Sequence, residues 1–154
     1  MFDRCILKIR EIIHYIMHIK IYKGKKVILR GVPQILYGNQ ITFGKNVRLN
    51  EKVYIHAANG ISIGENTTIS YGAMLISESY DIKHWENYIA RHHDGAPIVI
   101  GKNCWICANT MILPGVTIAD DIIVAAGAVV TKDLTETKCL YAGNPARLIK
   151  RLDA

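Results

Sequence analysis

Three histidines, His84, His92 and His93, lie in one short stretch, "SESYDIKHWENYIARHHDG". Imidazole accepts and returns protons near neutral pH, so histidine is the usual general base where an enzyme activates a hydroxyl group. Two of the carboxylates in the same stretch, Glu78 and Asp81, could each orient an imidazole through a hydrogen bond. These residue types at this spacing predict acid–base chemistry, and the stretch is the leading candidate for an active site.

A second group with potential chemistry is "CWIC", in which Cys104 and Cys107 have the spacing of a redox or zinc motif. Zinc needs a further pair of ligands, and the chain has no second C-x-x-C. On an extended strand the two side chains point to opposite faces. We therefore expect Cys104 to pack inward and no metal to be bound. Four scattered cysteines also make no disulfide framework, which favours a reducing cytoplasm.

An aliphatic repeat of six residues surrounds the histidine-bearing stretch and must position it. Upstream, the repeated positions are Phe43, Leu49, Ile55, Ile63, Ile69 and Leu75. Downstream, they are Ile100, Ile106, Ile112, Ile118, Val124 and Val130. A period of six fits neither an amphipathic helix nor a hairpin sheet, and it is the signature of a parallel β-helix. We predict an all-β fold in which three six-residue units make one coil and the stacked coils bury the aliphatic ladder.

The repeat stops for about twenty residues at the histidines, and we interpret residues 79–96 as one long inserted loop. The flat faces of a β-helix make poor pockets. Function is therefore expected on a loop that a rigid scaffold carries.

The first thirty residues depart from the repeat. Their apolar residues recur at three-to-four spacing, which predicts a short amphipathic helix ending near Ile19. Two roles stay open for this helix. It could pack against the first coil and cover an exposed strand edge. Alternatively, it could lie on an anionic membrane surface, where Lys8, Arg10 and Lys20 would meet lipid headgroups. Arg4 belongs to the same basic set.

Length and charge set the remaining limits. At 154 residues the chain is long enough for one domain with a real core, and we divide it into 1–30, the helix and lead-in, and 31–154, the β-helix. The segment 144–154 is expected to form a short tail or helix. No apolar run is long enough to span a membrane. The net charge of +6 is concentrated near the N-terminus, and no nucleic-acid-binding motif is present.

The segment "PIVIGKNCWICANTMILPGVTIADDIIVAAGAVVTKD", followed by "YAGNPARLIKRL", resembles the hexapeptide-repeat acetyltransferases, most closely the maltose, galactoside and sugar O-acetyltransferase branch. The resemblance runs from about Asn46 to the C-terminus. It implies a left-handed β-helix, acetyl-CoA as the cosubstrate, a sugar or polysaccharide acceptor, and a homotrimer with active sites between adjacent subunits.

The resemblance also implies a catalytic histidine near the start of the loop, but this chain has Tyr80 at that position. Tyrosine is a poor base at neutral pH, since its ordinary pKa is about 10. We expect a neighbouring histidine to replace it. His84 is the first choice because it lies four residues further on, and His92 or His93 is the alternative. Tyr80 and Asp81 are then expected on the acceptor side of the site.

Further positions follow from the same resemblance. Those assigned to the acetyl-CoA groove are Trp105, Ala108, Ala126, Thr131, Lys132 and Arg147. The small residues would leave the backbone open to the pantetheine arm, and the basic residues would meet the phosphates. Asn50 aligns with a family asparagine that contacts the acceptor sugar.

The predicted function is an acetyl-CoA-dependent O-acetyltransferase that modifies a sugar hydroxyl, with a cell-surface polysaccharide unit or its precursor as one candidate acceptor. Two alternatives stay open: an N-acetyltransferase acting on an amino-sugar or antibiotic, and a trimeric scaffold that has lost catalysis. A cytoplasmic location is expected, with peripheral membrane contact through the N-terminal helix as an addition. A zinc lyase on this fold would need three suitably spaced histidines, which the adjacent pair His92 and His93 does not supply.

Overall fold

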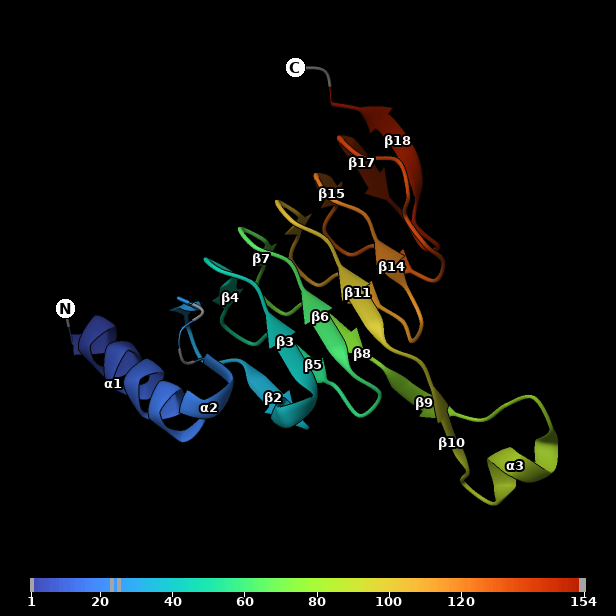
Figure 1. Ribbon diagram of the computed structural model, residues 1–154, viewed down its shortest axis with the longest axis horizontal. Helices are drawn as coiled ribbons and strands as arrows, with labels where there is room; N and C mark the ends of the chain where they lie inside the picture. Colours follow the sequence, from blue (N-terminus) through green and yellow to red (C-terminus); the bar gives the residue numbers. More distant parts are fainter. Residues whose placement is uncertain (1, 23, 25, 153–154) are drawn as a thin grey trace.

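The computed structural model describes residues 2–22, 24 and 26–152. Its body is a three-sided prism of stacked coils, with two helices at the first-coil end and an arm that projects from one edge (Figure 1). The helices are α1 (Phe2–Met17) and α2 (Ile19–Tyr22). Met1 of the predicted lead-in and residues 153–154 of the predicted tail lie outside the described residues.

Each face of the prism is one sheet in which successive coils pair in parallel, and only the last pair of sheet A, β17 with β18, is antiparallel among the described strands of the three faces. Sheet A contains β1 (Ile28–Arg30), β4 (Arg48–Asn50), β7 (Thr68–Ile69), β12 (Trp105–Ile106), β15 (Ile122–Val124), β17 (Cys139–Ala142) and β18 (Arg147–Arg151). Sheet B contains β2 (Gln34–Leu36), β5 (Tyr54–His56), β8 (Met74–Ile76), β13 (Met111–Ile112) and β16 (Val129–Val130). Sheet C contains β3 (Ile41–Phe43), β6 (Ile61–Ile63), β11 (Ile98–Ile100) and β14 (Thr117–Ile118). A 3-10 turn, η1 (Gly38–Gln40), precedes β3.

The core is the predicted aliphatic ladder. All twelve ladder residues named above are at most 2% exposed, so the predicted β-helix is confirmed. The strand registers stack them coil on coil: Leu49 pairs with Ile69, for example, and Ile106 with Val124. The β-helix begins earlier than Gly31, because β1 already pairs with β4.

One corner of the prism is held by stacked amides. Asn46, Asn66, Asn103 and Asp121 all have positive φ, between 54° and 60°, a conformation that asparagine and aspartate tolerate better than most residues. Asn46 Nδ2 donates to Asn66 Oδ1 at 3.2 Å, and Asn66 Nδ2 donates to Asn103 Oδ1 at 3.3 Å. Asn103 Nδ2 donates in turn to the Asp121 carboxylate at 2.9 Å. The ladder therefore stabilises the turn conformation and links four coils.

Asn66 is the position at which this ladder can be tested. Asn66→Ala should lower the free energy of unfolding by about 2 kcal/mol, because alanine strains the left-handed backbone and removes two hydrogen bonds. Asn66→Gly keeps the backbone unstrained and should cost only about 1 kcal/mol. Urea denaturation measures both losses. Equal losses for the two variants would show that backbone conformation is not the cause.

Helix α1 contacts the first coil through its polar side. His14 is buried, and its Nε2 lies 2.9 Å from the hydroxyl of Tyr22. The Tyr22 ring is fully buried, 5.8 Å from the ring of Phe43 at the end of the core. Tyr15 packs against the same core. The helix therefore covers the end of the β-helix, as one of the two sequence hypotheses expected, but it does so with aromatic and polar side chains.

The buried histidine should make this packing sensitive to pH. Burial, aided by the neighbouring His18, lowers the pKa of His14 to about 4, whereas the unfolded imidazole titrates near 6.5. The packed helix therefore binds fewer protons than the released helix between these values. Packing should be fully favourable above about pH 6.5 and weaken progressively toward pH 4.

Amide hydrogen exchange in α1, corrected for the intrinsic rate, measures this effect at pH 7.5 and pH 5. We expect protection to fall at the lower pH, and His14→Gln to remove most of the difference between the two. Equal protection of the unmodified protein at both values would contradict the prediction.

The predicted loop is an ordered arm. Strand β9 (Glu78–Tyr80) and strand β10 (His93–Gly95) form an antiparallel hairpin, and α3 (Trp85–Ile89) lies at its tip. The C-terminal tail also differs from one expectation: β18 forms a strand antiparallel to β17 instead of a helix. Within the described ranges, every helix is too short or too polar to cross a membrane.

Candidate active site

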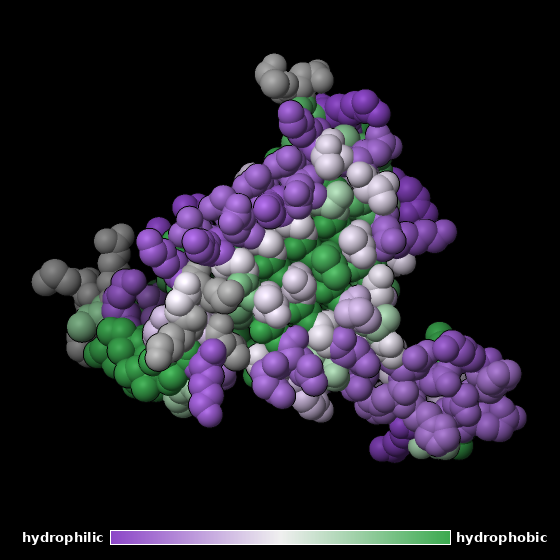
Figure 2. Space-filling view, viewed as in Figure 1, coloured by the Kyte–Doolittle hydropathy of each residue, from purple (hydrophilic) through white to green (hydrophobic). Residues whose placement is uncertain are grey.

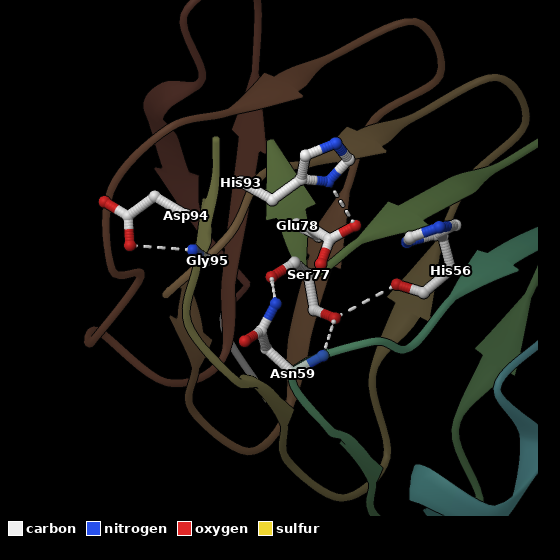
Figure 3. Close-up of polar contacts among 7 residues, drawn as sticks. All are labelled: His56, Asn59, Ser77, Glu78, His93, Asp94 and Gly95. Atoms are coloured by element: carbon white, nitrogen blue, oxygen red, sulfur yellow. Dashed lines mark hydrogen bonds and ion pairs between the residues drawn. The ribbon is translucent and has the colours of Figure 1, made fainter. Parts of the chain in front are cut away.

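The root of the arm is locked to the coil below it by Ser77, which is fully buried (Figure 3). Its hydroxyl donates to the backbone oxygen of His56 and accepts the backbone N–H of Asn59, both at 3.0 Å. Asn59 Nδ2 donates in turn to the backbone oxygen of Ser77 at 3.0 Å. Any side chain at Gly95 would overlap with Ser77 and Asn59, so glycine is required where the arm re-enters the prism. The first residue beyond this lock is Glu78.

Glu78 and His93 form a histidine–carboxylate pair on the two strands of the arm (Figure 3). His93 Nδ1 lies 2.8 Å from Glu78 Oε2. A carboxylate in this position accepts the proton of Nδ1 and leaves the lone pair of Nε2 free to act as a base. Both side chains are partly open to solvent, so a substrate can approach them. Of the two carboxylates proposed from the sequence, the structure thus brings Glu78 to a loop histidine.

His93 also lies directly opposite Tyr80 in the hairpin register. Their rings meet edge to face, with centroids 4.9 Å apart. The imidazole is therefore next to the position at which the sequence resemblance expects a catalytic histidine. The antiparallel pairing brings it there from the far end of the arm.

His84 and His92 are placed differently. His84 lies just before α3 at the tip of the arm, where its backbone oxygen accepts hydrogen bonds from the first turn of the helix. Its side chain lines an open apolar pocket with Ile82, Trp85 and Tyr88. His92 is exposed, and its backbone oxygen accepts the N–H of Asp81 at 2.8 Å.

The carboxylate of Asp81 stabilises the arm itself. One oxygen accepts the backbone N–H of Lys83 at 2.9 Å, and the other accepts the side-chain amide of Asn87 at 2.8 Å. Lys83 Nζ also bonds to Asp94 at 2.7 Å and ties the start of the tip to β10. This bond, with a second from the N–H of Gly95, lowers the pKa of Asp94. These contacts hold the hairpin that positions His93.

The residues predicted for the pantetheine groove lie along another edge of the prism, between sheets A and B. Trp105 faces outward and is half exposed, and its indole N–H donates to Ser70 Oγ at 2.9 Å. Ala108 and Ala126 occupy equivalent positions of the next two turns, which are joined by a bond from Gly127 N–H to Ala108 oxygen. Their small side chains leave this edge open. Sequence reasoning missed Ser70, because its contact with Trp105 joins two coils that the loop separates in the sequence.

The remaining predicted positions are spread more widely. Thr131 and Lys132 are exposed in the turn after β16. Arg147 is exposed at the start of β18, where its guanidinium donates to the Ala146 oxygen at 2.8 Å. Asn50 ends β4, and the strand registers place it on the same edge as Trp105, two coils earlier. Asn50 and Arg147 therefore border the edge between sheets A and B, whereas Thr131 and Lys132 lie in the turn between sheets B and C, the corner that also carries the arm.

Within one chain, the arm and the Trp105 edge do not meet. The arm leaves the corner between sheets B and C, whereas Trp105, Ala108 and Ala126 line the edge between sheets A and B. Figure 1 shows the arm extending away from the prism. A site that combines His93 with the predicted cofactor groove therefore requires a second copy of the chain.

Cys104 and Cys107, the two cysteines of "CWIC", pack within the coils. Cys104 is buried, its thiol lies 3.1 Å from the Ala119 oxygen, and burial raises its pKa. Cys107 is partly buried in the next turn, and burial raises its pKa as well. Among the residues that the structure describes, no cluster of three or more His, Cys, Asp or Glu side chains is arranged to hold a metal ion.

Stacked six-residue coils that bury an aliphatic ladder and carry a projecting arm define a hexapeptide β-helix. Residues 97–132 match the family described as bacterial transferase hexapeptide (six repeats). The chain is 32% identical over 129 residues to the protein named "Putative colanic acid biosynthesis acetyltransferase WcaF" from Escherichia coli K12, an alignment that covers 82% of this chain and 67% of that protein.

Two solved structures extend the likeness to three dimensions. The maltose O-acetyltransferase of Clostridium difficile 630 has 29% identity and a TM-score of 0.79, over 84% of this chain and 68% of that one. The hexapeptide-repeat acetyltransferase VCA0836 of Vibrio cholerae, in complex with acetyl coenzyme A, has 26% identity and a TM-score of 0.80, over 94% and 79%. The protein belongs to the hexapeptide-repeat acetyltransferases and is an acyltransferase, as its sequence predicted.

Proposed function

We propose that the protein transfers the acetyl group of acetyl-CoA to a hydroxyl of a sugar, with His93 as the general base. The observation that carries this proposal is the 2.8 Å contact between His93 Nδ1 and Glu78, directly beside Tyr80. One structural neighbour is a maltose O-acetyltransferase and another is a complex with acetyl coenzyme A, and these likenesses support the two substrates. His93 replaces His84 as the first choice because it has a carboxylate partner.

The reaction needs one base and no covalent enzyme intermediate. His93 Nε2 takes the proton of the sugar hydroxyl as its oxygen attacks the thioester carbonyl carbon. The tetrahedral intermediate then expels the thiolate of coenzyme A with cleavage of the C–S bond. The imidazolium returns its proton to that thiolate. Glu78 keeps the ring in one orientation and stabilises its charged form in the transition state.

We also propose a homotrimer in which the arm of one subunit completes the Trp105 edge of the next. The tip of the arm supports this arrangement, since Ile82, Trp85 and Ile89 expose most of their apolar surface. Such a surface is typical of a segment that packs against another chain. Sedimentation equilibrium should give a trimer at micromolar concentration, and a stable monomer would exclude the shared site.

A thiol-release assay with acetyl-CoA and a panel of sugars tests the proposed reaction. Release of free coenzyme A only when a neutral sugar is present supports O-acetylation. Release only with amino-sugars would replace the proposal by N-acetylation. No release with any acceptor from a correctly folded trimer would favour the scaffold hypothesis.

A further inference from the structure

Helix α1 packs against the prism with its polar side, whereas a surface helix of a globular domain usually packs with its apolar side. The side of α1 that faces the prism carries Glu11 and His14, which are 7% and 5% exposed. Isoleucine and methionine occupy the opposite side, and Ile16 and Met17 are 61% and 68% exposed. An amphipathic helix normally buries its apolar stripe in the core. Here the core is already closed by Tyr15 and Tyr22, so the stripe stays available.

The exposed stripe is continuous. Its members follow three-to-four spacing along one face of α1 and are Ile6, Ile9, Ile12, Ile13, Ile16 and Met17. Figure 2 shows the resulting apolar patch at the first-coil end of the molecule, at the opposite end from the arm. A patch of this kind on a surface marks a site of interaction with a protein or a membrane.

The charges around the stripe indicate which partner it meets. On the helical wheel, Lys8 and Arg10 flank the stripe on opposite sides. Both are exposed, although Lys8 Nζ lies 2.9 Å from the Glu11 carboxylate and Arg10 lies 3.8 Å from that of Glu51. Lys20 is exposed on the following helix. Residues 1–30 hold eight of the 19 Lys and Arg residues of the chain but only two of the 13 Asp and Glu residues. The other 124 residues contain eleven of each sign, so the whole net charge of +6 belongs to this end.

We propose that α1 binds the surface of an anionic lipid bilayer, with its isoleucine stripe in the interface and its basic residues at the headgroups. Lysine and arginine on the borders of an apolar face can extend to anionic headgroups while the aliphatic side chains enter the acyl region. A second copy of the chain fits less well, because it would bring one set of cations against another. This inference does not depend on the identity of the acceptor or of the catalytic base.

The packing of α1 is suited to this role. Because the helix is attached through the His14–Tyr22 contact and the Tyr15 ring, it can present its apolar face without unfolding. Docking therefore costs little ordering entropy. Since the arm leaves the prism well away from α1, a bound enzyme keeps its arm free (Figure 1).

Vesicle flotation with the full-length protein tests the proposal. The probes are vesicles of phosphatidylcholine alone and vesicles in which about one-third of the lipid is phosphatidylglycerol. We expect clear binding to the anionic vesicles, weaker binding to the neutral ones, and a loss of the difference at high salt. Failure of the unmodified protein to bind the anionic vesicles would overturn the proposal.

The decisive variant replaces Ile9, Ile13 and Ile16 with serine. Isoleucine and serine have similar helix propensities and these positions are exposed, so the fold should be retained. Binding to anionic vesicles should fall at least about tenfold, because each change removes apolar area from the lipid contact. Ile149→Ser is the matched control, since it removes an equally exposed isoleucine from β18. Equal losses in the triple variant and the control would overturn the proposal.

The charge contribution has its own pair of variants. Arg10→Gln combined with Lys20→Gln should weaken binding to anionic vesicles by more than about tenfold, at roughly 1 kcal/mol for each basic residue. Lys150→Gln, an exposed cation at the far end of the prism, should not. If the serine variant instead dissociates a vesicle-independent oligomer, the stripe is a contact between copies of the chain and the lipid proposal is wrong.

Discussion

Replacing His93 with alanine should lower the turnover number by roughly 10²–10⁴-fold, the usual contribution of a positioned general base. The affinity for acetyl-CoA should change little, because the residues predicted to hold acetyl-CoA belong to the coils and not to the arm. Steady-state kinetics with a responsive sugar, together with coenzyme A binding by calorimetry, separates the two effects. The reason for the large loss is geometric, since His93 is the loop histidine whose Nδ1 is held by a carboxylate.

Two controls make this result specific. His84→Ala removes an imidazole from the tip of the arm and should cost far less, since the ring lines an apolar pocket. Glu78→Gln keeps the size of the partner but removes its charge, so turnover should fall because the imidazolium formed in the transition state loses its carboxylate. A loss at His84 that exceeds the loss at His93 would return the catalytic role to the residue that the sequence favoured.

The aliphatic ladder could be predicted from the sequence because its pattern is visible within a short stretch of chain. Each coil repeats the same apolar position every six residues, and a stacked fold is the only simple way to bury such a repeat. The first coil was harder to recognise. Leu29 and Ile35 keep the six-residue spacing, but the turn Gly38–Gln40 then shifts the next ladder residue, Phe43, by two positions.

Which histidine is the candidate base depends on a contact between residues that are far apart in the sequence. Reading along the chain, His84 is the nearest substitute for a histidine at position 80. In the folded arm, the antiparallel register brings His93 opposite Tyr80, although they lie thirteen positions apart in the sequence. Hairpin register depends on the length of the turn and on the anchoring of both strands, here by Ser77 and Gly95. No periodic pattern in the sequence predicts such a pairing.

The orientation of α1 illustrates the same limit. Three-to-four spacing establishes that the helix has two faces, but it does not say which of them meets the body of the protein. The packed side is set by Tyr22, an aromatic residue beyond the helix. Its ring fills the end of the core, and its hydroxyl lies within hydrogen-bond distance of His14 Nε2. The polar side of the helix thus became the packed side.

Mixing two inactive variants should restore activity if the site is shared between subunits. His93→Ala disables the arm, and Ala126→Trp should block the predicted pantetheine edge of the neighbouring chain. Ala126 is exposed, so the larger ring can be accommodated without disturbing the ladder. In a cyclic trimer assembled at random from equal amounts, about one site in four pairs an intact arm with an intact edge.

The mixture should therefore regain about a quarter of the unmodified activity after the subunits are unfolded and refolded together, from two components that are each nearly inactive. Refolding either variant alone is the control and should regain nothing. The size of the recovery distinguishes the two arrangements, because an active site built within one chain can never be completed by mixing. No recovery from correctly assembled mixed trimers would place the arm and the cofactor edge in the same subunit and require the arm to fold back onto its own prism.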